Sequence, residues 1–226
     1  MTVFVMQLQS NLKSIEELIS QSRWSYKKPR TVNYRYNQDK LMHRLGDILV
    51  QYGIQHDTGL LPHEWHYHIS PRGKADIVQH NRDGQPIYVS LSYSYPYIEC
   101  VVDKEPVGID IEKISQRLDW RTLVTCFSTN EAHQICSLND FYQIWTQKES
   151  FTKLIGEGLI KGLDIYDMTQ SHFYQSREVK FKQFIFDQFM VQVCFLGQAP
   201  WGYKKVSVFQ LLRIGRASCR ERVCLY

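Results

Sequence analysis

Near the middle of the chain stands the segment Val107-Gly108-Ile109-Asp110-Ile111-Glu112, which alternates apolar and polar positions. Such alternation indicates a β-strand, because successive side chains of a strand point to opposite faces. Asp110 and Glu112 would therefore share one face, about 7 Å apart along the strand. Gly108 precedes them on that face and would leave room for a ligand to approach the backbone. The segment predicts a strand that presents two carboxylates to a partner.

A second segment, Trp145-Thr146-Gln147-Lys148-Glu149-Ser150-Phe151-Thr152-Lys153, has the spacing of a helix. Glu149 and Lys153 would lie one turn apart on a common side. Lys148 falls on the apolar stripe of this helix, so its amine must either reach solvent or meet an anion. If strand and helix meet, three carboxylates and a lysine would form a site for a divalent cation and a phosphate.

The same residues also have plain structural explanations. Asp110 and Glu112 would lie on the solvent-facing side of an edge strand, although two carboxylates on one face repel unless a cation lies between them. Glu149 and Lys153 would form an ordinary helical ion pair worth about 0.3–0.5 kcal/mol. For Lys148, reaching solvent remains open beside anion binding.

Two further candidates have structural roles as their first explanation. Ser128 and Glu131 have the spacing of a capping box at a helix start, so a catalytic role for Glu131 is secondary. His43 lies in the helix expected over residues 39–54, where an exposed histidine is the default and a phosphate contact the alternative.

Composition favours an ordinary soluble protein. The chain has 226 residues, of which 43% are hydrophobic and 22% charged. No run approaches the ~18 apolar residues of a membrane span, and the first residues lack the basic start of a signal peptide, so the cytoplasm is expected. The net charge of +4, which falls to +2 without residues 214–226, is too small to argue for nucleic acid but suits an acidic protein partner. The cysteines form no C-x-x-C pair, so neither zinc nor a redox motif is predicted.

The final residues, 214–226, differ in composition and follow neither helical nor strand periodicity. They look like the translation of sequencing-adapter DNA, and we expect them to be a non-native tail. A natural basic tail is the alternative.

The remaining pattern predicts an α+β fold of two similar lobes, residues 1–105 and 106–213, each a small, mostly antiparallel sheet with helices. A tight turn at residues 104–106 would make strands 98–102 and 107–111 an antiparallel pair. The expected strands are 1–7, 87–91, 98–102, 107–111, 179–186, 189–195 and 206–211, and the expected helices are 39–54, 120–126, 130–136 and 140–154.

The two motifs, V-G-I-D-I-E and W-x-x-K-E-S-x-x-K, resemble the signature of the 4′-phosphopantetheinyl transferases, specifically the longer surfactin-synthetase-activating type. The resemblance extends from the N-terminal strand to about Leu212. The weaker matching pieces, in order, are Arg35-Tyr36, the segment 45–50, Trp65-x-Tyr67, Gly73-Lys74, Phe127-x-x-x-Glu131 and the segment 158–163.

The resemblance implies lobes related by a pseudo-two-fold axis, with coenzyme A and Mg²⁺ in the cleft between them, and it leaves open whether Mn²⁺ can replace Mg²⁺. It makes Asp110, Glu112 and Glu149 the metal ligands. It also implies coenzyme contacts: Lys148 and Lys153 with the phosphates, and Arg35, His43 and Lys74 near the adenine or the 3′-phosphate. Two positions depart from the family pattern: Tyr93 replaces a histidine, and Ala75 replaces a proline. Tyr93 could still donate a hydrogen bond to a phosphate, but it carries no positive charge near neutral pH.

The implied reaction transfers 4′-phosphopantetheine from coenzyme A to a serine of an acidic apo acyl or peptidyl carrier protein and releases adenosine 3′,5′-bisphosphate. Lys153 would stabilise charge, and Glu149, a water on the ion, or Glu131 behind them would accept the serine proton. A monomer is expected. The sequence does not say whether the carrier protein belongs to fatty acid, polyketide, peptide or lysine biosynthesis. The alternatives are a coenzyme- or carrier-binding module without turnover, and a different Mg²⁺-dependent phosphotransferase or hydrolase.

Overall fold

The computed structural model describes residues 1–8, 12–20, 22, 24–27, 34–81, 84–159, 162–199 and 202–217. It confirms the prediction of a mixed α+β protein built from small, mostly antiparallel sheets and helices. Of the helices described, none is both long and apolar enough to cross a membrane.

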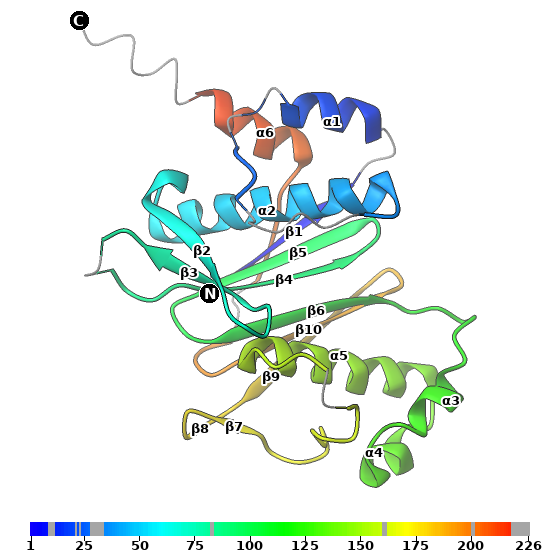
Figure 1. Ribbon diagram of the computed structural model, residues 1–226. Helices are drawn as coiled ribbons and strands as arrows, with labels where there is room; N and C mark the ends of the chain where they lie inside the picture. The colour runs from blue at the N-terminus through cyan, green and yellow to red at the C-terminus, as the bar shows by residue number, and fades with distance from the viewer. Residues whose placement is uncertain are drawn as a thin grey trace, which may run out of the picture.

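The first sheet has four strands and carries the longest helix on one face (Figure 1). Its strand order is β11 (Tyr203–Lys205), β1 (Thr2–Gln7), β5 (Tyr97–Asp103) and β4 (Tyr88–Ser94). β5 is antiparallel to both β1 and β4, whereas β11 is parallel to β1. Helix α2 (Asn37–Thr58) lies on this sheet, and α1 (Leu12–Ser20) and α6 (Val208–Ala217) lie beyond it.

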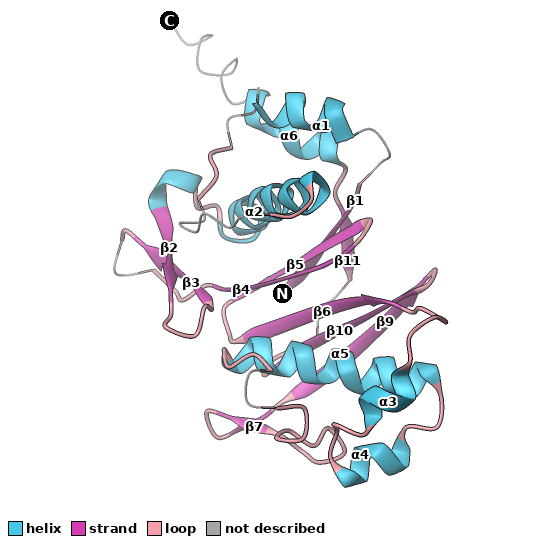
Figure 2. Ribbon diagram, turned by 45° about the vertical axis from the view of Figure 1, so that its right-hand side comes forward, coloured by secondary structure: helices cyan, strands magenta, loops and turns pink. Residues whose placement is uncertain are grey.

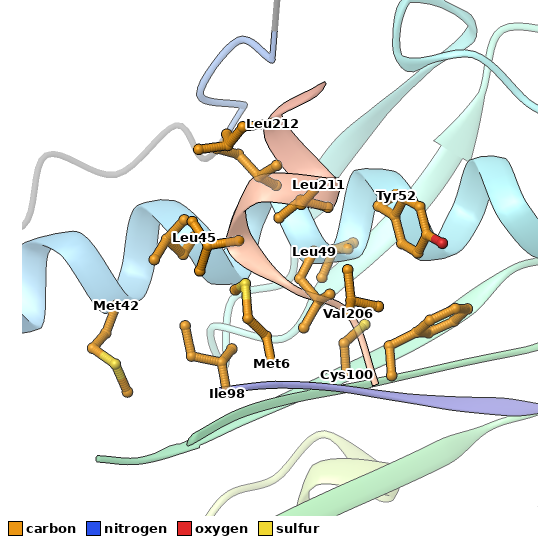
Figure 3. Packing of buried hydrophobic residues seen from close by; sticks show 14 of the residues in the cluster. Met6, Met42, Leu45, Leu49, Tyr52, Ile98, Cys100, Val206, Leu211 and Leu212 are labelled. Carbon is orange, nitrogen blue, oxygen red and sulfur yellow. The ribbon is translucent and has the colours of Figure 1, made fainter. Parts of the chain in front are cut away.

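Apolar side chains fill the space between α2 and this sheet (Figure 3). Leu45 and Leu49 of α2 are completely buried, four residues apart on one helical face. They meet Met6 of β1, Ile98 of β5 and Leu211 of α6, so one core joins the two ends of the chain.

The second sheet has three antiparallel strands and is covered by α5 (Figure 2). Its order is β6 (Val107–Lys113), β10 (Phe189–Phe195) and β9 (Lys180–Phe186), and α5 spans Leu138–Ile155. The smaller elements are η1 (Pro62–Glu64), β2 (Trp65–Ile69), β3 (Ala75–Gln79), α3 (Trp120–Val124), α4 (Thr129–Gln134), β7 (Phe173–Tyr174) and β8 (Arg177–Glu178).

The two sheets meet through an apolar layer and a seam of serines. Val5 and Val101 of the first sheet share a buried cluster with Ile109 and Val191 of the second. Along the seam, β6 backbone N–H groups donate to alternate β4 hydroxyls: Ile109 to Ser90 (3.1 Å), Ile111 to Ser92 (3.3 Å) and Lys113 to Ser94 (3.0 Å). The serine side chains of β4 therefore accept the β6 N–H groups that backbone carbonyl groups would accept between two ordinary paired strands.

The predicted antiparallel pairing of strands 98–102 and 107–111 is wrong. β5 has its two hydrogen-bonded neighbours in β1 and β4, and β6 pairs with β10 instead. The turn after Asp103 therefore carries the chain from one sheet to the next rather than closing a hairpin.

The end of the described chain also differs from the prediction. Residues 206–211 were expected as a strand, but Val208, Leu211 and Leu212 are buried at helical spacing in α6. Because β11 pairs with β1 and α6 packs on α2, residues 203–217 lie with the first sheet and not within the expected second lobe. Residues 218–226, most of the expected non-native tail, lie outside the described residues. The prediction also missed α1 and the β2–β3 hairpin.

Gly108 marks the point where α5 approaches β6 most closely. A Cβ atom on Gly108 would lie 1.9 Å from the Ser150 carbonyl oxygen and 2.8 Å from the Leu154 nitrogen. The space that the sequence offered to a ligand is therefore filled by the helix backbone. Gly108 allows the helix to pack closely on the strand, and this packing determines the distance between α5 and β6.

We predict that Gly108→Ala lowers the free energy of unfolding by about 3 kcal/mol or more, because the helix must move to admit a methyl group. Gly202→Ala is the matched control, since a Cβ there meets nothing within 4 Å. Urea denaturation of both variants measures the difference. Equal stability of the two variants would contradict the close packing.

Candidate functional site

One face of α5 lies along β6 and brings the predicted residues together. The Trp145 indole N–H donates to Glu112 Oε1 at 3.2 Å, and Lys153 Nζ donates to Asp110 Oδ1 at 2.7 Å. Glu149 lies midway between Trp145 and Lys153 on the same helical face, because residues four apart are neighbours. The structure therefore joins the two segments through Lys153–Asp110 and Trp145–Glu112, with Glu149 on the same face of the helix.

Asp110 is the most enclosed of the three carboxylates, with 3% of its surface exposed. Its Oδ1 atom accepts hydrogen bonds from the Ser92 hydroxyl (2.9 Å) and from Lys153. Its Oδ2 atom is buried and has no hydrogen-bond partner among the described residues. Lys153 Nζ is held further by Ser92 Oγ (3.0 Å) and the Ile109 carbonyl (3.1 Å).

The three carboxylates influence one another. Burial, and then the charge of Asp110, raise the pKa of Glu112 to about 7. Burial also raises the pKa of Glu149, with Asp110 adding to the shift and Lys153 opposing it. Negative charge is therefore in excess around Asp110, and one lysine offsets only part of it.

The donor set fits a hard divalent cation. Carboxylate oxygens are the ligands that Mg²⁺ prefers, and the unpartnered Oδ2 of Asp110 is one such atom. A cation would also relieve the repulsion from Asp110 that adds to the effect of burial on the pKa values of Glu112 and Glu149. Over the described part of the chain, however, no three histidine, cysteine or acidic side chains already stand close enough together to hold an ion. The metal site therefore stays a prediction.

Lys148 lies on another side of α5 from Lys153. Its side chain is 1% exposed, and Nζ forms an ion pair with Glu131 Oε1 at 2.6 Å. Nζ also donates to the Tyr166 carbonyl and lies over the Phe127 ring. Of the two alternatives for Lys148, its amine meets an anion, and that anion is a buried carboxylate of the protein. These contacts favour a structural role over the predicted role in holding coenzyme phosphates.

Both carboxylate oxygens of Glu131 are likewise occupied by contacts within the protein. Its Oε2 accepts the Ser128 N–H at 3.0 Å in the predicted capping box, and its Oε1 accepts the Met168 N–H at 2.8 Å. With the Lys148 pair added, the carboxylate of Glu131 links α4, α5 and the segment at Met168. None of the contacts found in the described structure joins it to Asp110, so the geometry gives its predicted catalytic role no support.

A cavity of about 270 Å³ lies beside Lys153. Lys74 reaches it from the β2–β3 turn, its Nζ donating to the Leu154 carbonyl at 2.7 Å. Burial lowers the pKa of Lys74, and Asp76 opposes that shift. The cavity therefore places two amines where an anion could bind. Its wall includes Arg72, Gly73, Val50, Tyr67, Thr152 and Gly156.

The other predicted coenzyme contacts do not line this cavity. Arg35 is exposed and stacks its guanidinium over Tyr36, 5.6 Å from the ring centroid. His43 packs between Tyr34 and Tyr93, with ring centroids 4.9 Å and 4.6 Å away.

Tyr93 fills space beneath α2. Its hydroxyl is buried without a hydrogen-bond partner in the described structure, and a Cβ on Gly46 would lie 2.5 Å from it. Burial raises the pKa of Tyr93. This orientation does not offer the hydroxyl to a phosphate in the cavity. Ala75, the other departure, lines the cavity at the start of β3.

Sequence reasoning missed two contributors to the site. Ser92 binds both Asp110 and Lys153, and Trp145 binds Glu112. The period-two serines at 90, 92 and 94 were a signal for the first, since small hydroxyls on one strand face suit a close neighbour. Nothing in the helix itself indicates a polar role for Trp145, which only its contact with β6 shows.

Comparison with known proteins agrees with these motifs. A model described as the 4′-phosphopantetheinyl transferase superfamily matches residues 106–198. The 4′-phosphopantetheinyl transferase gsp of Aneurinibacillus migulanus is 30% identical over 118 residues, which cover 47% of this chain and 48% of that protein. The transferase psf-1 of Bacillus pumilus is 29% identical over 184 residues, or 74% and 73% of the two chains.

The 4′-phosphopantetheinyl transferase Sfp of Bacillus subtilis (strain 168) is 27% identical over 148 residues, or 63% of this chain and 64% of that protein. The chain thus spans about half of the first of these three relatives and less than two thirds of the third.

We predict that the stability of the metal-free protein falls as pH rises from about 4.5 to about 7, partly through Glu112. Its folded pKa of about 7 lies above the reference value of 4.5, so folding favours the protonated form and that stabilisation is lost as the group ionises. Glu112→Gln should reduce the fall by an amount on the order of 2 kcal/mol. Urea denaturation in a chelator at several pH values measures it, with exposed Glu178→Gln as the control. An unchanged pH profile in Glu112→Gln would contradict the assignment.

Proposed function

Because the chain belongs to the 4′-phosphopantetheinyl transferase superfamily through residues 106–198, we propose that it moves 4′-phosphopantetheine from coenzyme A to a serine of an apo carrier protein. The second product would be adenosine 3′,5′-bisphosphate. The observation that carries the proposal is the contact of Lys153 with Asp110, which joins the two signature segments beside Glu112 and Glu149.

Asp110, Glu112 and Glu149 would hold Mg²⁺, as their oxygen donors and mutual repulsion suggest. When bound, the ion would offset the negative charge of the coenzyme pyrophosphate. Lys153 would lie beside that charge, and its part exposure, 29%, leaves its amine accessible to a ligand. Its role would be electrostatic stabilisation of the phosphorus centre and the leaving oxygen.

The coenzyme would occupy a cleft between two lobes related by a pseudo-two-fold axis. In support, each of the two sheets carries one long helix, α2 or α5 (Figure 2). The cavity wall draws on both units, with Val50 and Leu91 from the first and Thr152 and Lys153 from the second. Lys74 and Lys153 would bind phosphate oxygens there.

The attacking serine must lose a proton. Glu131 was one candidate acceptor, but its carboxylate is held by Lys148 and by two backbone N–H groups. Glu149, one turn from Lys153, is the better candidate, since burial raises its pKa and so makes it a stronger base than an exposed carboxylate.

The carrier protein would dock beside Glu112. A hollow of about 660 Å³ begins at the next residue, Lys113. Its wall combines the basic Lys113 and Arg117 with the apolar Ile114 and Ile185, the last of which is 62% exposed. Such a surface suits an acidic partner with an apolar contact.

A binding module without turnover is the second candidate. The buried hydroxyl of Tyr93 favours it, because the corresponding family position was expected to contact a phosphate. The assay below separates the two functions, since a module would bind coenzyme A and leave the carrier unchanged.

We predict that incubation with coenzyme A, Mg²⁺ and an apo carrier protein adds one phosphopantetheine to the carrier, as read by mass spectrometry. Asp110→Ala and Glu149→Ala should each lower transfer about a thousandfold or more, because each removes an oxygen ligand of the ion that would offset the phosphate charge. Glu178→Ala, on the exposed β8, is the matched control. Circular dichroism checks that all variants fold. Full transfer by either site variant would reject the assigned ion site.

We predict that charge reversal in the hollow raises the KM for the carrier about tenfold and leaves the KM for coenzyme A unchanged. The variants are Lys113→Glu and Arg117→Glu, and Lys180→Glu at the far end of β9 is the control. Added salt should weaken wild-type transfer in the same way, since it screens the attraction. Equal effects in all three variants would place the carrier elsewhere.

A further inference from the structure

The β2–β3 hairpin carries a pair of histidines that the proposed reaction does not use. In its antiparallel register His66 lies opposite Val78, and the His80 N–H donates to the Glu64 carbonyl at 2.8 Å, just beyond β3. His66 and His80 are therefore diagonal neighbours on one face. That face is exposed, because the alternate residues Trp65 and Tyr67 point into the core.

The two imidazoles approach each other edge to edge. His80 Nε2 lies 3.2 Å from His66 Nδ1, and the ring centroids are 5.3 Å apart with planes inclined by 34°. Both side chains are exposed to solvent. A single ring-to-ring hydrogen bond accounts for this spacing if one nitrogen carries the proton. When neither of these two nitrogens carries the proton, both lone pairs are free to face a common ion.

We propose that His66 and His80 together chelate one divalent transition-metal ion, such as Zn²⁺, Ni²⁺ or Cu²⁺. Two bonds of 2.0–2.1 Å at a tetrahedral angle separate the ligand nitrogens by roughly 3.3 Å. The observed separation of 3.2 Å matches that geometry with little movement of either ring. Imidazole is a preferred ligand of these ions.

The pair forms an open site of modest affinity. Over the described residues no third histidine, cysteine or acidic side chain completes a cluster with them, so water would fill the other positions. His68 lies on the same face but pairs across the strands with Asp76, two residues further along. The site differs in chemistry from the carboxylates around Asp110, because Mg²⁺ prefers oxygen ligands and competes poorly for imidazole.

Binding at this pair would brace the hairpin. β2 and β3 form a separate two-stranded sheet, an arrangement that is marginal without other support. An ion bridging His66 and His80 would join the strands at the end of the hairpin away from its turn. The turn presents Lys74 to the cavity beside Lys153, so the braced element is the one that supplies a cavity amine.

The test is isothermal titration of the full chain with ZnCl₂ in excess Mg²⁺, which occupies oxygen ligands and leaves imidazoles available. Wild type should bind one Zn²⁺, and His66→Ala or His80→Ala should weaken that binding at least about tenfold. His68→Ala is the matched control on the same face and should bind as wild type does. Zn²⁺ should also raise the Tm of wild type and of His68→Ala, but not of the pair variants.

Unchanged Zn²⁺ affinity in both pair variants would overturn the proposal, as would an equal loss in His68→Ala. Absence of saturable binding to wild type would leave only a hydrogen bond between the rings and would also overturn it. None of these results depends on transferase activity, so this site and the proposed reaction succeed or fail separately.

Discussion

The contact between α5 and β6 at Gly108 determines how far the α5 side chains of the candidate site stand from the carboxylates of β6. Because the helix backbone rests on a residue without a side chain, α5 lies close enough for Trp145 and Lys153 to reach Glu112 and Asp110. A larger residue at position 108 would lift the helix and lengthen both contacts. The chemistry thus depends on the absence of one methyl group, at a position that touches no predicted ligand.

Much of this arrangement could be predicted from local patterns. Alternation identified β6, helical spacing identified α2 and α5, and the capping box at Ser128 marked the start of α4. These features depend on residues near one another in sequence. Pairing between distant segments was harder to predict: nothing local to β6 indicates β10 as its partner, and nothing in α6 indicates its return to α2.

Lys148 and Lys153 of α5 show that the partner of a single side chain is also hard to predict when it comes from a distant segment. Both were expected to bind phosphate, yet Lys148 is closed into an ion pair with Glu131, while Lys153 lies at the cavity. The helical pattern placed Lys148 correctly on the apolar side, where its amine had either to reach solvent or to meet an anion. It could not say whether the anion was a ligand or a carboxylate of the protein, because that carboxylate comes from α4.

The serine seam between β4 and β6 leaves backbone carbonyl oxygens of β6 free to accept other hydrogen bonds. An adjacent strand would normally use both the N–H and the C=O groups along the edge of β6. Serine hydroxyls take up the N–H groups alone, and the carbonyl of Ile109 is left to accept Lys153. A sheet edge closed by alcohols in place of peptide groups leaves its carbonyl oxygens free to accept, and here one of them holds the Lys153 amine at the cavity.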